Sequence, residues 1–270
     1  MKTLGRRAAF PTKPRAMKDV MLRFQISFWC CLLVSAIAVA DDGTLIVHGG
    51  GNVSSEVRDR FLELAGGSHA KLLVIPTADT ETPEDDGRLE TWRTRKPASV
   101  ALLHASSREQ AEAEQFAEPL KRATGVWISG GKQSVLASTY LKTPVERELS
   151  ELLKRGGVIA GTSAGAAIMS RVMIVRGEIR EGFDLLPQGV VDQHFEARDR
   201  QTRLLKVLAA HPRRFGIGVD ENTAAIVLGN RLSVIGESTV SIFATKRDQP
   251  PQRIVRLTAG EVFDLAALRE

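Results

Sequence analysis

The chain has almost no cysteine and few aromatic residues, and these shortages exclude several classes of protein. Only two of its 270 residues are cysteine, Cys30 and Cys31, and both lie in an apolar N-terminal stretch. The remainder therefore has no disulfide framework, no thiol nucleophile and no cysteine-ligated metal site. Aromatic residues make up 5% of the chain, and no basic run with interleaved aromatics follows residue 40, so we expect no nucleic-acid partner.

The first 40 residues have the pattern of a secretory leader. Basic residues precede an apolar run from Ile26 to Val39, and Ala38-Val39-Ala40 forms an A-x-A cleavage site. The apolar run is short for a membrane span. We therefore predict a signal peptide over residues 1–40, a periplasmic or extracellular location, and no stable membrane association after cleavage. A signal anchor is the alternative.

Removal of this leader abolishes the basic character of the chain. The full sequence has 37 basic and 32 acidic residues. Seven of the basic residues but only one acidic residue lie within residues 1–40. The remaining 30 basic and 31 acidic residues give a net charge of −1. The basic isoelectric point of the full sequence thus indicates no polyanionic partner.

Strand-like and helix-like segments alternate between residues 41 and 170. This alternation predicts an α/β fold with a mainly parallel sheet and helices on both faces. Within it, we expect one helix over Ser107–Thr124 and a polar loop over Pro83–Pro97. After residue 171 short β-like runs predominate, which predicts a β-rich C-terminal part with one helix near Arg198–Ala210. No linker or repeat divides residues 41–270, so we predict a single domain.

The most informative motif is Gly161-Thr162-Ser163-Ala164-Gly165, a G-x-S-x-G pentapeptide. It follows an apolar, partly β-branched run and precedes a segment that favours a helix opening. Strand, sharp turn and helix are the context of a nucleophile elbow, in which a strained serine presents its hydroxyl to solvent. The Ala164 N–H at the helix start is a candidate oxyanion donor, and Gly131, at the end of the preceding strand, is a second.

A nucleophilic serine needs a base and an acid that orients the base. His194 follows a β-branched run, and Asp220 and Glu221 follow another apolar run, at the strand ends where sites collect in α/β sheets. A structural histidine and a simple polar turn are the alternatives for these positions. The sequence has no H-E-x-x-H motif, close histidine pair or carboxylate-rich loop, so we expect no metal and no cofactor.

Four motifs occur in order along the chain: Gly130-Gly131-x-Gln133, Gly161-Thr162-Ser163-Ala164-Gly165-Ala166, Asp192-Gln193-His194-Phe195 and Asp220-Glu221-x-Thr223-Ala224. From about Gly43 to its C-terminus, the chain resembles the cyanophycinase branch of the cyanophycinase/dipeptidase E serine peptidase family. The resemblance implies a sheet of the class I glutamine amidotransferase-like type and one serine peptidase domain over residues 41–270. It also implies Ser163 as nucleophile, His194 as base and Glu221 as the acid that orients His194.

The resemblance further implies an exopeptidase that cleaves aspartyl peptides, with β-Asp-Arg dipeptides released from cyanophycin as the preferred product. The family's substrate-contacting positions fall on Gln133, Asp192, Gln193, Arg198, Arg200 and Arg203. Guanidinium groups suit bidentate binding of a substrate carboxylate, whereas pairing with Glu196 and Asp199 on a solvated helix face is the alternative. Lys132 departs from the family, which more often has an acid or an amide there. The expected partner is a peptide, and the oligomeric state stays open, a homodimer included.

Two other functions remain as alternatives. His48-Gly49-Gly50-Gly51 looks like the oxyanion motif of lipases, and G-x-S-x-G is shared with α/β-hydrolase esterases. That fold orders its triad serine, acid, histidine, whereas the acid here follows the histidine, so we interpret Gly49–Gly51 as a tight turn near the site. The second alternative is an exported binding protein of the same fold that has lost catalysis.

Overall fold

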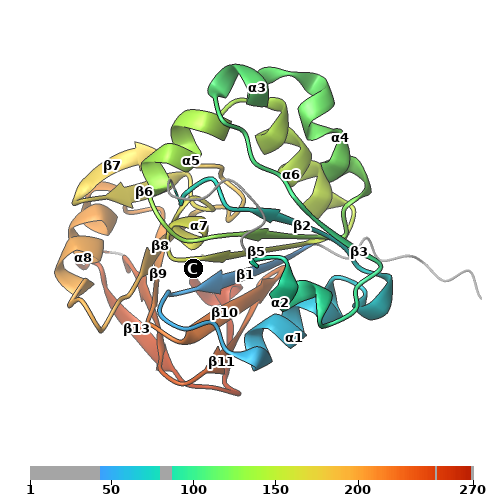
Figure 1. Cartoon of the computed structure of the whole chain (residues 1–270). Helices are drawn as coiled ribbons and strands as arrows, with labels where there is room; N and C mark the ends of the chain where they lie inside the picture. Colours follow the sequence, from blue (N-terminus) through green and yellow to red (C-terminus); the bar gives the residue numbers. More distant parts are fainter. Residues whose placement is uncertain (1–42, 80–86, 247, 269–270) are drawn as a thin grey trace, which may run out of the picture. The chain divides into compact units, whose positions relative to one another are not determined.

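The structure, a computed structural model, describes residues 43–79, 87–246 and 248–268, and the predicted leader over residues 1–40 lies outside them. As predicted, a mainly parallel sheet with helices on both faces is followed by a β-rich C-terminal part (Figure 1). Within the described ranges, the helices lack the length and apolar character that crossing a membrane would require.

The central sheet has eight strands in the order β14-β11-β10-β1-β5-β4-β2-β3. Neighbours from β1 to β3 pair in parallel, whereas β10, β11 and β14 continue the sheet antiparallel from β1. The strands are β1 (Thr44–His48), β2 (Lys71–Ile75), β3 (Ser99–Leu102), β4 (Gly125–Ile128), β5 (Val158–Thr162), β10 (Thr223–Leu228), β11 (Arg231–Gly236) and β14 (Val262–Asp264).

A second sheet, in the order β13-β12-β9-β8, contains the C-terminal strands that matter most for the site. Its strands β8 and β9 are parallel neighbours, so their carboxyl ends lie at the same edge. The elements of this part are β8 (Gly189–Gln193), α8 (Gln201–Ala210), β9 (Phe215–Val219), β12 (Val240–Ala244) and β13 (Gln252–Leu257). A separate hairpin consists of β6 (Val172–Val175) and β7 (Glu178–Glu181).

Alternation along β1 explains why helices cover both faces of the central sheet. Leu45 and Val47 belong to the apolar cluster shared with α4 to α7, whereas Ile46 belongs to the cluster shared with α1 and α2. Figure 1 shows these two groups of helices on opposite sides of the sheet. They are α1 (Ser55–Leu64), α2 (Glu90–Arg93), α3 (Arg108–Glu112), α4 (Glu114–Arg122), α5 (Gln133–Tyr140), α6 (Pro144–Lys154) and α7 (Ala164–Ala167).

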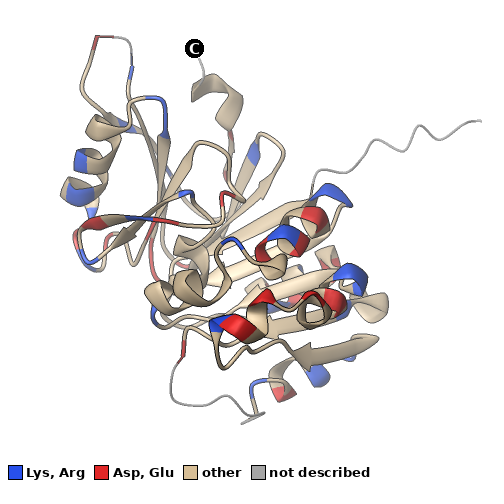
Figure 2. Cartoon of the chain, turned by 90° about the horizontal axis from the view of Figure 1, so that it is seen from above, with Lys and Arg blue, Asp and Glu red and all other residues tan. Residues whose placement is uncertain are grey.

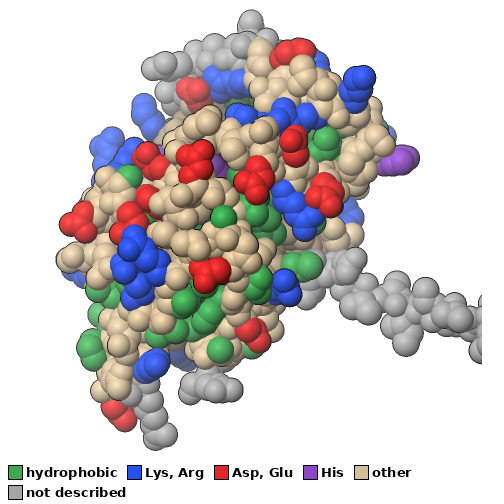
Figure 3. Space-filling view, turned by 90° about the horizontal axis from the view of Figure 1, so that it is seen from below, with side chains coloured by type: hydrophobic (Ala, Val, Ile, Leu, Met, Phe, Trp, Pro, Cys, Tyr) green, Lys and Arg blue, Asp and Glu red, His purple; other side chains and the backbone are tan. Residues whose placement is uncertain are grey.

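Charged residues lie mainly on the helices and loops, and both signs are interspersed. Figure 2 shows this mixture on the helices, while the strands of the central sheet carry few charges. The face seen in Figure 3 likewise mixes basic, acidic and apolar side chains. Two short 3-10 helices, Gly67–His69 and Leu265–Leu268, complete the described elements.

The prediction of one helix over Ser107–Thr124 is wrong, whereas the helix expected near Arg198–Ala210 is confirmed with a later start. The helix expected over Ser107–Thr124 is divided into α3 and α4 at Ala113, whose ψ of 124° is extended. The break directs α3 toward the end of α5, where Arg108 donates to the carbonyls of Ser138 and Leu141. The helix expected from Arg198 begins only at Gln201, because Asp199 adopts a left-handed φ of 47°.

The loop prediction over Pro83–Pro97 is wrong for the described residues 87–97, which contain α2. Leu89 and Trp92 are buried in the cluster beneath α1. The Trp92 ring lies 5.2 Å from Phe61 and 5.1 Å from Trp127 between ring centroids. The segment is ordered because two apolar side chains contact partners distant in the sequence, which local polarity does not reveal.

We expect Trp92→Ala to destabilise the protein by about 3–5 kcal/mol, because it opens a cavity in a buried aromatic cluster. The measurement is urea unfolding followed by far-UV circular dichroism. Trp92→Phe, which retains an aromatic ring, is the control and should cost less. An unfolding free energy of Trp92→Ala within about 0.5 kcal/mol of the unmodified protein, as for surface changes, would contradict this prediction.

Candidate active site

Ser163 lies in a strained turn between β5 and the short helix α7. Its φ of 50° and ψ of −107° lie outside the regions that non-glycine residues ordinarily adopt. The turn requires small neighbours, since a Cβ on Gly161 would lie 2.3 Å from the carbonyl oxygen of Gly165. The Ser163 N–H donates to the His48 carbonyl at 3.0 Å. The serine therefore sits in the strand-turn-helix geometry expected of a nucleophile elbow.

Three of the predicted residues form one hydrogen-bonded line. Ser163 Oγ lies 2.8 Å from His194 Nε2, and His194 Nδ1 lies 2.5 Å from Glu221 Oε1. These side chains follow β5, β8 and β9, so the carboxyl ends of strands from both sheets meet here. With its Nδ1 proton donated to Glu221, the neutral imidazole has Nε2 free to accept from the serine hydroxyl.

The surroundings of His194 favour its neutral form. Burial lowers the pKa of this imidazole below its usual range, and the positive charges of Arg198 and Arg200 lower it further. The hydrogen bond to Glu221 raises the pKa, but only enough to offset part of the decrease. The imidazole is therefore mostly unprotonated at neutral pH, as a proton acceptor must be.

Asp220, the acid next to Glu221, has other partners. Its Oδ1 accepts from the backbone N–H groups of Glu196 and Ala197 at 3.1 and 2.9 Å, and its Oδ2 accepts from the Ser238 hydroxyl at 2.7 Å. Burial raises the pKa of this carboxyl, but the hydrogen bonds from Ala197 and Ser238 outweigh burial and lower the pKa overall. Asp220 thus anchors the turn that follows His194, while Glu221 faces the imidazole.

Residues Gly49 to Gly51 fasten the loops of the second sheet to the end of β1. The Gly49 carbonyl accepts from the His194 N–H, and the Gly50 carbonyl accepts from the Asn222 N–H, both at 2.8 Å. The Gly49 N–H donates to the Thr223 carbonyl at 3.0 Å, and the Gly50 N–H donates to His48 Nδ1 at 3.1 Å. These two N–H groups are engaged within the protein and are not available to a substrate oxyanion, which supports the interpretation of Gly49–Gly51 as a turn beside the site.

We expect Gly50→Ala to impair turnover, because its Cβ would lie 2.2 Å from His194 Cε1 at a backbone φ of 108°. A displacement of the imidazole by about 1 Å should lower kcat by about 10²-fold. The comparison is Gly67→Ala, which also has a positive φ, of 59°, but whose Cβ would meet nothing within 4 Å. Normal kcat in a folded Gly50→Ala protein would show that this contact does not position His194.

The two predicted oxyanion donors belong to segments that border Ser163. Ala164 is the first residue of α7, where backbone N–H groups lack helical partners. A Cβ on Gly130 would lie 3.4 Å from Ser163 Cβ, so the turn after β4 that carries Gly131 adjoins the serine. The Lys132 N–H donates to the Ala78 carbonyl at 2.8 Å and holds this turn in place.

The predicted substrate-contacting residues at the end of β8 and in the segment that follows it are largely paired with one another. Asp192 is fully buried, and Arg203 binds both of its carboxylate oxygens, with Nε 2.7 Å from Oδ2. Arg200 Nη1 lies 3.6 Å from Asp192 Oδ1 and donates to the Gln193 carbonyl at 2.5 Å. Burial raises the pKa of Asp192, against the lowering effect of Arg203. Arg198 differs from the other two arginines in being exposed.

Other residues near the site have structural contacts that the sequence interpretation did not include. Gln133, the first residue of α5, donates through Nε2 to the Ile174 carbonyl at 2.7 Å. His48 and Thr162 were not identified as site residues, yet they are register partners in β1 and β5, and His48 Nδ1 lies 3.0 Å from Thr162 Oγ1. Each belongs to a motif noted in the sequence, His48 to the glycine-rich turn and Thr162 to the G-x-S-x-G pentapeptide, but neither motif predicts this contact. Among the described residues, no cluster of three or more histidine or acidic side chains could hold a metal.

Comparisons with known proteins identify the family of the chain. Residues 45–235 match peptidase family S51. Cyanophycinase from Geminocystis herdmanii is 34% identical over 224 residues, covering 78% of this chain and 80% of the relative. Cyanophycinase from Trichormus variabilis is 35% identical over 210 residues, covering 73% and 69%. The crystal structure of a peptidase from an acI-B1 actinobacterium has a TM-score of 0.65 and 28% identity, covering 83% of this chain and 98% of that chain.

The fold and these similarities define a hydrolase of the serine peptidase type, with exopeptidase character. The match runs from β1 into β11 and includes β5, β8 and β9, the strands that precede Ser163, His194 and Glu221. The chain belongs to peptidase family S51.

Proposed function

We propose that the chain is an exported peptidase that hydrolyses aspartyl peptide bonds through a Ser163-His194-Glu221 triad. The main support is the continuous line of hydrogen bonds from Ser163 Oγ to Glu221 Oε1, at 2.8 and 2.5 Å. The strained φ of 50° at Ser163 adds to it, because strain of this kind is typical of functional sites.

In this mechanism His194 Nε2 takes the hydroxyl proton of Ser163 while Oγ attacks the scissile carbonyl carbon. The N–H groups of Ala164 and Gly131 stabilise the oxyanion of the tetrahedral intermediate. The imidazolium, oriented by Glu221, then gives the proton to the leaving amine as the C–N bond breaks. Water activated by His194 hydrolyses the resulting acyl ester and regenerates Ser163.

The assignment of the acid has its own test, because two adjacent carboxylates are present. Glu221→Gln should lower kcat by about 10⁴-fold, as loss of the orienting acid does in other triads. Asp220→Asn is the matched variant; it should weaken the turn after His194 and reduce thermal stability more than kcat. Steady-state kinetics and thermal unfolding of both variants provide the measurement. If Asp220→Asn lowers kcat severely while Glu221→Gln has a normal kcat, Asp220 is the acid that orients His194.

For the substrate, we propose release of β-Asp-Arg dipeptides from cyanophycin or related aspartyl peptides. The names and identities of the curated relatives support this class. Arg198 is exposed, so its guanidinium is available to a substrate carboxylate; Gln133 and Gln193 complete the proposed recognition set. Asp192 contributes by holding Arg203 and Arg200 at the end of β8, since its own carboxylate is buried.

The decisive experiment is mass spectrometry of products, with kcat/KM for the β-Asp-Arg polymer, β-Asp-Lys, β-Asp-Leu and α-Asp peptides. Lys132 should weaken binding of a cationic side chain by about 1 kcal/mol, a several-fold effect, so Lys132→Asp should improve kcat/KM for β-Asp-Arg. No change in Lys132→Asp would remove Lys132 from the specificity argument. No cleavage of any aspartyl peptide would overturn the proposed substrate.

Two controls separate this proposal from its alternatives. A panel of p-nitrophenyl esters, tested beside isoaspartyl peptides, distinguishes an esterase by its preference. Labelling with a fluorophosphonate probe distinguishes an inactive binding protein, in which Ser163 would stay unmodified.

Export is proposed from the leader pattern of residues 1–40. N-terminal sequencing of the exported protein should begin at Asp41, one residue after the A-x-A site. Retention of the apolar segment in a membrane fraction would favour a signal anchor.

A further inference from the structure

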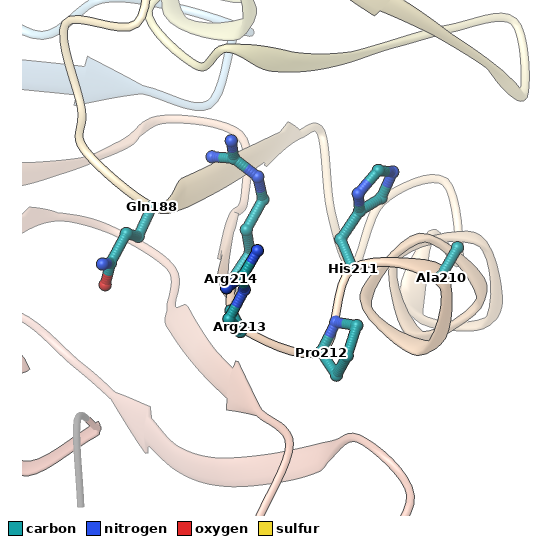
Figure 4. Close-up of a pocket in the computed structure, with 6 residues that line it drawn as sticks. All are labelled: Gln188, Ala210, His211, Pro212, Arg213 and Arg214. Atoms are coloured by element: carbon teal, nitrogen blue, oxygen red, sulfur yellow. The ribbon is translucent and has the colours of Figure 1, made fainter.

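A hollow of about 460 Å³ lies near the starts of β8 and β9, at the ends of these strands opposite His194 and Glu221. It is lined by Gln188, Ala210, His211, Pro212, Arg213 and Arg214 (Figure 4). In this view Gln188 and His211 lie on either side of the two arginines. An adjoining hollow of about 290 Å³ shares Gln188, Arg213 and Arg214 with it and adds Thr245. A five-residue strand spans roughly 16 Å, so this place is distinct from the Ser163 site.

The charged side chains among the described lining residues are basic. Arg213 and Arg214 line both hollows, and no acidic side chain is among the described residues that line either. Arg214 Nη1 and Thr245 Oγ1 are buried, and neither has a hydrogen-bond partner among the described residues. Buried donors are rarely left unsatisfied, because an unpaired one is destabilising. Arg214 and Thr245 both line the smaller hollow, so a ligand bound there that offers anionic oxygens would lie beside both side chains.

We propose that these residues form a second site, which binds a small oxyanion such as phosphate or a carboxylate. Arginine suits this ligand because its planar guanidinium makes paired hydrogen bonds to anionic oxygens. The lining is held by backbone contacts: the Phe215 N–H donates to the Gln188 carbonyl at 3.1 Å, and the Arg214 N–H donates to the His211 carbonyl at 2.9 Å. A bound anion would therefore tie the start of β8 to the start of β9. This inference is independent of the peptidase mechanism.

The test is thermal unfolding during titration with inorganic phosphate, or with succinate, at constant ionic strength balanced by chloride. The unmodified protein should show a saturable rise in Tm, as a ligand of the native state produces. Arg214→Gln should raise the apparent Kd about tenfold or more, and Thr245→Val should raise it by a smaller factor. Arg176→Gln, at an exposed turn, is the matched control and should leave Kd unchanged. The two titrants distinguish a phosphate site from a carboxylate site.

Equal Kd values in the unmodified protein and Arg214→Gln would overturn the proposal, and so would the absence of a saturable rise with either anion. If Arg214→Gln does not fold, Thr245→Val decides: an unchanged Kd in this variant overturns the site.

A separate observation concerns His48, which is fully buried at the end of β1. Its Nδ1 accepts from the Gly50 N–H and lies 3.0 Å from the Thr162 hydroxyl. Gly50 packs against the ring of His194, and Thr162 directly precedes Ser163. Burial, followed by the positive charge of Arg58, lowers the pKa of His48 to about 4, so its imidazole is neutral at pH 7.

We infer that His48 is a positioning residue. Its side chain contacts both the Gly50 turn beside the base and Thr162 beside the nucleophile, and so fixes the two relative to each other. This inference rests on the proposed triad. His48→Leu, which removes the acceptor, should slow fluorophosphonate labelling of Ser163 and lower kcat about tenfold, with KM little changed. His48→Asn should retain most activity, because its amide oxygen can accept the same N–H.

The outcomes separate this inference from the proposed function. If Ser163 is not labelled in the unmodified protein, the triad is wrong. If Ser163 is labelled and His48→Leu reacts at the same rate, only the role of His48 is wrong. Should His48→Leu not fold, Thr162→Val tests the same link, and an unchanged labelling rate in that variant overturns it.

Discussion

Ser163→Ala is expected to lower kcat by about 10⁶-fold while leaving the fold intact, since removal of a triad nucleophile costs about this much in other serine peptidases. The turn at φ 50° is already strained with serine, and alanine is no larger, so no new clash arises. Product release followed by mass spectrometry measures the loss, and circular dichroism checks the fold.

Ser134→Ala is the matched control for Ser163→Ala, because Ser134 is an exposed serine on α5 and is not part of the hydrogen-bonded line. It should retain the activity of the unmodified protein. Near-normal turnover in a folded Ser163→Ala protein would remove Ser163 from the mechanism.

His194→Ala should match Ser163→Ala in severity, because the members of a triad act as a unit. The pH profile gives a second, independent reading. Catalysis needs the unprotonated imidazole, so kcat/KM should rise with pH through the pKa of His194 and then level off. Burial lowers that pKa below the usual value of about 6.5, so the acid limb should lie below pH 6.5.

The measurement is kcat/KM between about pH 4 and pH 8 with an uncharged substrate side chain, such as β-Asp-Leu. Glu221→Gln removes the interaction that raises this pKa, so the limb of its residual activity should move to lower pH. Activity that decreases from pH 5 to pH 7 would mean that the protonated imidazole is the active form.

Much of the site could be predicted because its residues follow apolar strands in short, ordered motifs. Ser163 is predicted from this context, whereas the choice of His194 over a structural histidine needed the family resemblance; both residues lie at strand ends in the structure. Glu221 needed the family resemblance, since sequence position alone does not separate it from Asp220. In the structure the two acids have different partners. Glu221 contacts the His194 imidazole, whereas Asp220 accepts from backbone N–H groups and from Ser238.

The pairing of Asp192 with Arg203 could not be predicted from the sequence. The two residues are 11 positions apart, and whether they meet depends on how the start of α8 packs against the end of β8. Glu196 was weighed as a partner for the arginines after His194, but it contacts Arg253 and Arg256 of β13 instead. Which of several nearby charged residues form ion pairs depends on the topology of the sheet, and local sequence patterns do not encode that topology.

The cluster of Phe61, Trp92 and Trp127 has a practical consequence for how this protein is observed. The sequence contains three tryptophans, and Trp29 lies within the predicted leader, so the processed chain would have only Trp92 and Trp127. Their rings are 5.1 Å apart on the side of the central sheet covered by α1 and α2. Intrinsic tryptophan fluorescence would therefore report only on this side of the central sheet. It would not respond to local changes in the strands that carry His194 and Glu221. A tryptophan placed at Phe243, which contacts Phe195 next to His194, would make the second sheet visible to the same instrument.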